Sequence, residues 1–285
     1  MTTTFKYHGV LESHRNEDDI DAAVEEIHNI GYVVIDSGFS PAELQLVRDK
    51  SESIYAQQAQ ECGGEDNLHK MHDACIARCT ISYDDYFVRL AAHPRLMRLV
   101  SRLLGDNFIL LGQNAIVNQP NQQHDQAVWH RDLTYQHFVS SRPLAISALY
   151  CIDDFTRLTG ATTMLPASHR VESFPSQLFV EKHQQIVEAP AGSIIVFDAM
   201  LYHRGGQNLS GRTRLGINHI FVLPLFKQQI DLPRALGGKF QDDPFLARLL
   251  GYESASPASA YLWRKNKIDK SAPDAGARPH QAKAG

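Results

Sequence analysis

The stretch FDAMLYHRGGQNLSGRTRLGINHIF, residues 197–221, predicts a strand, a turn and a second strand. Its first apolar run ends at His203, and a Gly-Gly-Gln-Asn turn then leads to Arg212 and Arg214 at the start of the second run. An arginine there is unfavourable unless it meets an anion, and a guanidinium binds a carboxylate through two parallel hydrogen bonds. Both arginines lie on one face of a strand, so the pattern does not choose between them. A surface salt bridge is the alternative for either.

Short β-rich runs of the same kind occupy most of residues 106–226. They are separated by Gly, Pro, Asn and Ser, and they include NFILLGQNAIVNQ, AVWHRDLTY, LAISALYCIDDF, TTMLP, GSIIVFDAM and RLGINHIFVLP. Several short strands with no helices between them predict an antiparallel sandwich or barrel. We therefore expect a mainly β fold with flanking helices.

The N-terminal part, residues 16–105, is predicted to be mainly helical and to pack on the β core. DIDAAVEEIHNIGY has the apolar spacing of a helix, followed by a short strand at YVVID. Ser40 and Glu43 have the spacing of a capping box, and the helix they begin should run to about residue 60. Pro94 lies inside a later helical pattern and predicts either two helices or a kink.

The rest of the chain completes one expected domain over residues 1–265. A C-terminal extension is expected at 227–265, after the β core. The stretch 266–285 is polar and rich in Ala, Pro, Lys and Gly, so we expect a disordered tail there.

Bulk composition narrows the class of protein. The chain has 285 residues and a formal net charge of −4, which argues against nucleic acid as a partner. Four cysteines without a C-x-x-C pair predict no disulfide framework, and the N-terminus has no apolar signal sequence. No apolar run approaches the roughly 18 residues that span a bilayer. We expect a cytoplasmic protein, monomeric or homodimeric, that does not bind membranes.

The stretch AVWHRDLTY, residues 127–135, carries a second signal. His130 and Asp132 project from the same face if this stretch is a strand. Two such ligands and one more histidine make a facial triad, which binds Fe(II) and leaves coordination positions open. Chance alone gives roughly one His-x-Asp pair per chain of this composition, so the pair is informative only together with His203.

Taken together, these motifs resemble the phytanoyl-CoA dioxygenase family. The resemblance is carried by W-H-x-D at 129–132, Pro-x-Ser-His at 166–169, H-R-G-G-Q-N-x-S at 203–210 and an arginine eleven residues after His203. It covers about residues 20–235. It implies an Fe(II)- and 2-oxoglutarate-dependent dioxygenase with a double-stranded β-helix, the cupin-like jelly roll, as its core at 106–226.

The resemblance also implies roles for individual residues. His130, Asp132 and His203 match the iron ligands, and Arg214 matches the arginine that binds the distal carboxylate of 2-oxoglutarate. Thr162 matches a threonine that contacts 2-oxoglutarate in some members. Gln113, a polar residue on an otherwise apolar run, is a further candidate for the cofactor site. Halogenating relatives replace the carboxylate with a small residue. Asp132 therefore favours hydroxylation, desaturation or a similar oxidation with O2.

The substrate is expected to be a small metabolite or biosynthetic intermediate. An acyl-CoA would favour a basic entrance, whereas this chain is slightly acidic. Pocket walls in such folds come from loops and neighbouring elements. The polar or aromatic residues in those positions are Tyr135, His137, Phe138, Asn118 and His72.

Three other interpretations remain open at the level of sequence. A hydrolytic zinc enzyme could use the same ligands, although the H-E-x-x-H motif of many zinc hydrolases does not occur. A jelly-roll protein could bind a metal or ligand without oxygenase activity. A purely structural β protein could carry the charged residues on its solvent face.

Overall fold

The structure is a computed structural model, and it describes residues 6–13, 15–122, 127–133 and 138–271. Its helices and strands follow one another in this order: α1 (Asp19–Ile30), β1 (Tyr32–Asp36), α2 (Pro41–Glu61), α3 (Glu65–Lys70), β2 (Ile76–Arg78), η1 (Thr80–Ser82), η2 (Asp85–Phe87), α4 (Val88–Ala91), α5 (Pro94–Leu104), β3 (Ile109–Asn118), β4 (Ala145–Cys151), β5 (Thr163–Met164), η4 (Ser168–Arg170), α6 (Gln177–His183), β6 (Gln185–Ile186), β7 (Ser193–Asp198), β8 (His203–Arg204), β9 (Arg214–Val222), α7 (Leu232–Ala235), α8 (Pro244–Leu249), η5 (Tyr252–Ser254) and α9 (Ala260–Ser271).

Two antiparallel sheets form the core. The large sheet has the order β1-β7-β4-β9-β3-β2, and the small sheet has the order β6-β5-β8. Neighbours in the large sheet are mostly distant in sequence, as in a jelly roll; β9, for example, pairs with both β3 and β4. The described strands do not close into a barrel. The predicted fold, a mainly β jelly roll with flanking helices, is confirmed.

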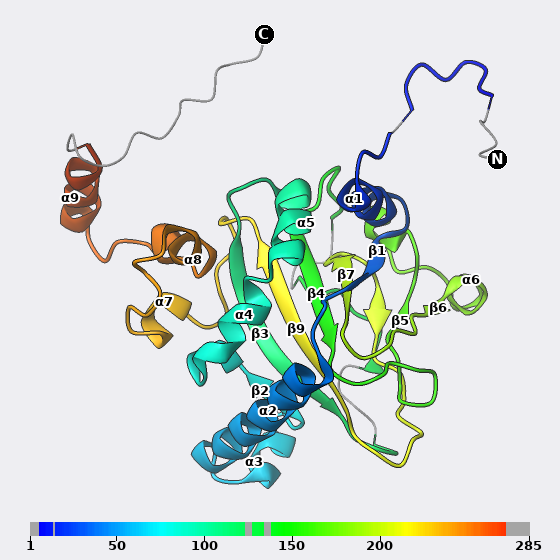
Figure 1. Ribbon diagram of the computed structural model, residues 1–285, viewed down its shortest axis with the longest axis horizontal. Helices are drawn as coiled ribbons and strands as arrows, with labels where there is room; N and C mark the ends of the chain where they lie inside the picture. The colour runs from blue at the N-terminus through cyan, green and yellow to red at the C-terminus, as the bar shows by residue number, and fades with distance from the viewer. Residues whose placement is uncertain (1–5, 14, 123–126, 134–137, 272–285) are drawn as a thin grey trace.

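The N-terminal helices cover one face of the large sheet, as Figure 1 shows. Alternation along β9 explains this: Leu215 and Ile217 point into the helix-covered core, whereas Arg214 and Asn218 line a pocket on the other face. Burial of apolar side chains from α1, α2, α4 and α5 against this face gives the molecule its largest core. The sheet is thereby fixed, and its opposite face is left free for a site.

The predicted helix signals are confirmed in detail. Ser40 and Glu43 form the capping box of α2, with Pro41 at its first turn. Gly31 ends α1 in the left-handed region, with φ of 97°, which a glycine adopts without strain. At Pro94 the chain forms two helices, since α4 ends at Ala91 and α5 begins at the proline.

Two strand predictions were wrong. Residues 127–133 form no regular strand, and His130 makes only an isolated bridge to His203. His203 does not end the strand that contains Phe197; β7 ends at Asp198, and His203 begins β8 in the other sheet. Periodicity along the chain did not reveal this change of sheet, because the intervening residues are also apolar.

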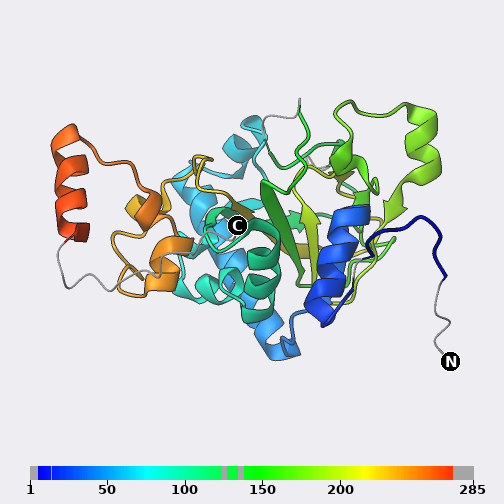
Figure 2. The ribbon, with the colours of Figure 1, turned by 90° about the horizontal axis from the view of Figure 1, so that it is seen from above.

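The C-terminal segments lie at one end of the molecule. Figures 1 and 2 show α9 standing away from the sheets, beyond α7 and α8. α9 includes residues 266–271, the first part of the stretch for which a disordered tail is expected. Among the described residues, the helices are too short or too polar to cross a lipid bilayer.

Candidate metal and cofactor site

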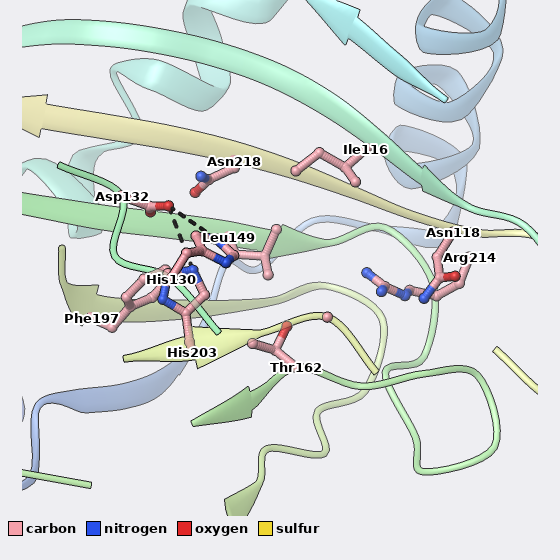
Figure 3. A pocket seen from close by; sticks show the side chains of 11 residues that line it. Ile116, Asn118, His130, Asp132, Leu149, Thr162, Phe197, His203, Arg214 and Asn218 are labelled. Atoms are coloured by element: carbon pink, nitrogen blue, oxygen red, sulfur yellow. Dashed lines mark ion pairs between the residues drawn. The ribbon is translucent and has the colours of Figure 1, made fainter. Parts of the chain in front are cut away.

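The two histidines and the aspartate converge on one point. Nε2 of His203 lies 3.5 Å from Oδ1 of Asp132, and Nε2 of His130 lies 3.8 Å from the same oxygen. One potential ligand atom from each residue falls within 4.8 Å of the others. Figure 3 shows the three side chains pointing toward one another. This spacing lets a single ion contact all three.

Backbone hydrogen bonds bring the two ligand segments together. The amide and carbonyl of His130 pair with those of His203, at 2.9 and 3.0 Å, and the Asp132 amide donates to the Ala199 carbonyl at 3.0 Å. His130 therefore lies beside β8 at the edge of the small sheet and Asp132 lies beside Ala199, and both side chains project the same way although residues 127–133 form no regular strand. Both side chains share a face as expected, but backbone hydrogen bonds to Ala199 and His203 place them there and not a regular strand.

Both imidazoles are oriented for coordination through Nε2. Nδ1 of His130 lies 2.8 Å from the Val128 carbonyl, and Nδ1 of His203 lies 2.9 Å from the Leu201 carbonyl. A carbonyl accepts, so each Nδ1 carries a proton and each Nε2 is the atom directed at Asp132, where it can bind an ion once it is unprotonated. Such contacts fix ring orientation in metal sites.

Asp132 is held as a carboxylate. Its Oδ2 accepts a hydrogen bond from the Ser147 hydroxyl on β4, which leaves Oδ1 directed at the imidazoles. Burial opposes its charge, but the nearby histidines and Ser147 outweigh burial and hold the pKa of Asp132 well below its usual range. Burial lowers the pKa of His130, which favours its neutral, ligating form.

Arg214 lies at the other end of the same pocket. Only 4% of it is exposed, and its guanidinium donates to the Gly160 carbonyl at 2.9 Å and stacks 4.0 Å from the centre of the Phe155 ring. Burial lowers the pKa of Arg214 to about 10, so it is charged at neutral pH. Among the described residues, no carboxylate lies within salt-bridge distance of it. A buried cation without a carboxylate in direct contact favours an anionic ligand.

Two glycines shape the arginine end. A side chain on Gly160 would place Cβ 2.5 Å from the Gly206 carbonyl oxygen, and one on Gly206 would meet the Ala161 oxygen at the same distance. The close approach lets the Gly160 carbonyl accept from Arg214 while the Gly206 carbonyl accepts from Asn118 at 2.9 Å. The H-R-G-G-Q-N turn thus supports the buried arginine.

The pocket connects the two ends. Figure 3 shows His130, Asp132 and His203 at one end, Arg214 with Asn118 at the other, and Thr162 between them. The lining residues come from both sheets and are Ile116, Asn118, His130, Asp132, Leu149, Thr162, Phe197, His203, Gly205, Arg214 and Asn218.

Several predicted site residues lie elsewhere. Gln113 is fully buried on the helix-covered face, where it contacts Thr80 and His219, so the assignment of Gln113 to the cofactor pocket was wrong. His72 and Phe138 are exposed and do not line the pocket. Arg212 is also exposed, unlike Arg214. Predicted residues Tyr135 and His137 lie outside the described residues.

Asn218 and Ser147 were not predicted, although they belong to the site. Asn218 lies four residues after Arg214, and strand alternation could have placed it on the pocket face. Its Oδ1 is buried without a hydrogen-bond donor among the described residues. Nothing in the sequence around Ser147 indicates its contact with Asp132.

Comparison with known proteins gives the family. Residues 27–216 match the model of the phytanoyl-CoA dioxygenase (PhyH) family. An uncharacterized Mycobacterium tuberculosis protein, Rv1501, is 32% identical over 227 residues, which cover 78% of this chain and 82% of the relative. The chain belongs to the phytanoyl-CoA dioxygenase family, as its motifs predicted.

Solved structures share the fold. EctD from S. alaskensis, solved with 2-oxoglutarate and 5-hydroxyectoine, has a TM-score of 0.62 at 20% identity and covers 76% of this chain and 81% of its own. The epimerase SnoN, solved with Fe3+, alpha ketoglutarate and nogalamycin RO, has a TM-score of 0.56 at 18% identity and covers 72% and 84%. The fold is the jelly roll of 2-oxoglutarate-dependent oxygenases.

Proposed function

We propose that the protein is a non-haem Fe(II)- and 2-oxoglutarate-dependent dioxygenase that hydroxylates, or otherwise oxidises, a small metabolite or biosynthetic intermediate. Succinate and CO2 are the co-products. One observation carries the proposal: a His-Asp-His cluster opens into the same pocket as a buried arginine without a carboxylate partner among the described residues. Family membership supports the same reaction class.

The three donors fit Fe(II). Two neutral imidazoles and one carboxylate are the facial donor set of non-haem iron oxygenases, and His130, Asp132 and His203 would supply it. The histidines would bind it through Nε2 and Asp132 through Oδ1, while Ser147 holds the other oxygen of Asp132. When bound, the iron supplies the chemistry that activates O2 with 2-oxoglutarate as reductant.

The far end of the pocket is proposed to bind 2-oxoglutarate. Arg214 pairs with the distal carboxylate, which neutralises a cation that the fold buries beforehand. Thr162 offers a hydroxyl and Asn118 an amide to the same ligand. The apolar side chain of Leu149 lines the space between the two ends and helps exclude water.

The substrate site is proposed to lie against the metal end. Phe197 and Asn218 line the pocket there and are neutral, so we expect this part of the substrate to be uncharged. Asn218 can hydrogen-bond a polar group of the substrate. Tyr135 and His137 stay as predicted substrate residues.

The test is anaerobic addition of Fe(II) and 2-oxoglutarate to the metal-free protein. We expect a weak visible charge-transfer band, which chelator removes. A succinate-release screen over a metabolite panel then identifies substrates. A folded protein without the band would refute the proposal, and a band without succinate release would support the alternative, a jelly-roll protein that binds metal and ligand without turnover.

We also propose that residues 1–265 act as one oxygenase domain, with a helical part at 16–105, the jelly roll at 106–226 and an extension at 227–265. Packing of α1 and α2 on the large sheet supports this division. All four cysteines are free thiols, which fits a reducing cytoplasmic setting.

A further inference from the structure

Arg131 lies between two of the proposed metal ligands and points away from the pocket. Only 3% of it is exposed. Its guanidinium donates to the backbone carbonyls of Ser168 at 3.0 Å, Glu172 at 3.4 Å and Val171. These carbonyls belong to η4 and the residues after it, so one side chain joins the His130–Asp132 segment to residues 168–172.

Tyr202, which precedes the third ligand, contacts the same segment. The centre of its ring lies 3.9 Å from the Arg131 guanidinium carbon. The Tyr202 amide donates a hydrogen bond to the Ser168 hydroxyl at 2.9 Å, and the Tyr202 hydroxyl donates to the Glu172 carbonyl at 3.0 Å. Arg131 and Tyr202 therefore attach both ligand segments to residues 168–172 and to each other.

These contacts of Arg131 and Tyr202 matter because the segments that carry the metal ligands have little regular secondary structure of their own. β8 has two residues, and His130 makes only a single bridge. Relative movement of these segments would change the distance between the His130 and His203 rings, whose centres lie 4.3 Å apart. A planar guanidinium can hold three carbonyls in fixed directions, whereas a lysine ammonium cannot reproduce that geometry.

We propose that Arg131 is a positioning residue: with Tyr202 it holds His130 and Asp132 at coordinating distance from His203 before the metal binds. This inference rests on the proposed function only in requiring that the His-Asp-His cluster bind a metal. It assigns Arg131 no contact with metal, co-substrate or substrate.

Arg204 provides a matched control. It follows His203, as Arg131 follows His130, and its guanidinium carbon lies 5.2 Å from the centre of the Trp129 ring. It is only half-buried, and its hydrogen bond is to the side chain of Gln184 at 3.3 Å. Arg204 thus has the same charge as Arg131 and also follows a proposed metal ligand, but its guanidinium does not bind the backbone of residues 168–172.

The experiment compares Arg131→Lys, Tyr202→Leu and Arg204→Lys with wild type. Co(II) is titrated into each metal-free protein, and its visible absorption gives both the dissociation constant and the coordination geometry. Residues that orient metal ligands typically change metal affinity by about 10–100-fold. We expect losses in that range for Arg131→Lys, a smaller loss for Tyr202→Leu, and an altered Co(II) spectrum at saturation in both. Arg204→Lys should stay within about threefold of wild type.

The melting temperature of each metal-free protein separates positioning from simple stability. If Arg131→Lys melts earlier but binds Co(II) with wild-type affinity and spectrum well below its melting temperature, the inference is overturned. An equal loss in Arg204→Lys also overturns it. If Arg131→Lys does not fold, Tyr202→Leu decides, with wild-type affinity as the refuting result. A wild-type protein that binds no Co(II) would instead remove the proposed function itself.

Discussion

The two ends of the pocket are prepared for their ligands in different ways. At the metal end, Asp132 and the two imidazoles already face one another, with each ring fixed by a backbone carbonyl. At the other end, the Arg214 charge is buried against a carbonyl and an aromatic ring. The metal end is organised mainly by geometry, whereas the arginine end holds an unbalanced charge. Removal of a metal-binding group should therefore lower metal affinity only. Removal of the Arg214 charge should lower 2-oxoglutarate affinity and should also stabilise the ligand-free protein.

The largest effect is expected from Asp132→Asn, which keeps the size of the side chain and removes its charge. Metal affinity should fall by more than about 100-fold, beyond the range seen for supporting residues. The Fe(II)–2-oxoglutarate band should disappear. Isothermal titration with Co(II) measures the first effect, and an affinity close to wild type would contradict the assignment of Asp132 as a ligand.

Arg214→Met should weaken 2-oxoglutarate binding by roughly 100-fold, since each hydrogen bond to a charged group contributes about 1.5–3 kcal/mol. Metal affinity should not change. Because the substitution removes an unbalanced buried charge, the ligand-free protein should melt at the same or a higher temperature. Arg212→Met is the control, and an equal loss of 2-oxoglutarate affinity in that exposed position would contradict the choice of Arg214.

Ser147→Ala should have an intermediate effect at the metal end. It removes the hydrogen bond to Oδ2 of Asp132, so the carboxylate can rotate. We expect metal affinity to fall by about tenfold, the lower part of the range for groups that orient ligands. 2-Oxoglutarate affinity, measured at saturating metal, should stay the same. A change confined to 2-oxoglutarate binding would show that Ser147 serves the other end.

The smallest effect on the site itself is expected at Asp198, a buried carboxylate that does not line this pocket. Burial raises the pKa of Asp198 to about 6, although Met200 and two arginines favour the charged form. Because the folded state holds this proton more tightly, the contribution of Asp198 is most favourable below about pH 4 and is lost as pH rises through about 6.

Asp198→Asn should therefore stabilise the protein at pH 7.5 by roughly 1–3 kcal/mol, given about 1.4 kcal/mol per pKa unit. At pH 4 the variant and wild type should have nearly equal free energies of unfolding, as measured by urea denaturation. Co(II) affinity at pH 7.5 should match wild type. A stabilisation that persists unchanged at pH 4 would rule out ionisation of Asp198 as its cause.

Some errors in the sequence-based prediction were avoidable. Gln113 and Asn118 were both expected in the pocket. Side chains that are five positions apart on one strand point to opposite faces unless a bulge lies between them. The only register shift in the pairing of β3 with β9 lies between Leu110 and Gly112, before both residues. Strand alternation alone therefore required that one of the two assignments fail.

The sequence by itself determined the capping of α2, the break at Pro94, the β-rich core, the family, and the neighbouring positions of His130 and Asp132. These features depend on covalent geometry and on residues close together in the chain. Only the tertiary structure decided that His130 bridges to His203, that Ser147 holds Asp132, and that Arg131 and Tyr202 contact residues 168–172. Contacts between distant segments depend on how both sheets pack, and no local spacing encodes that packing.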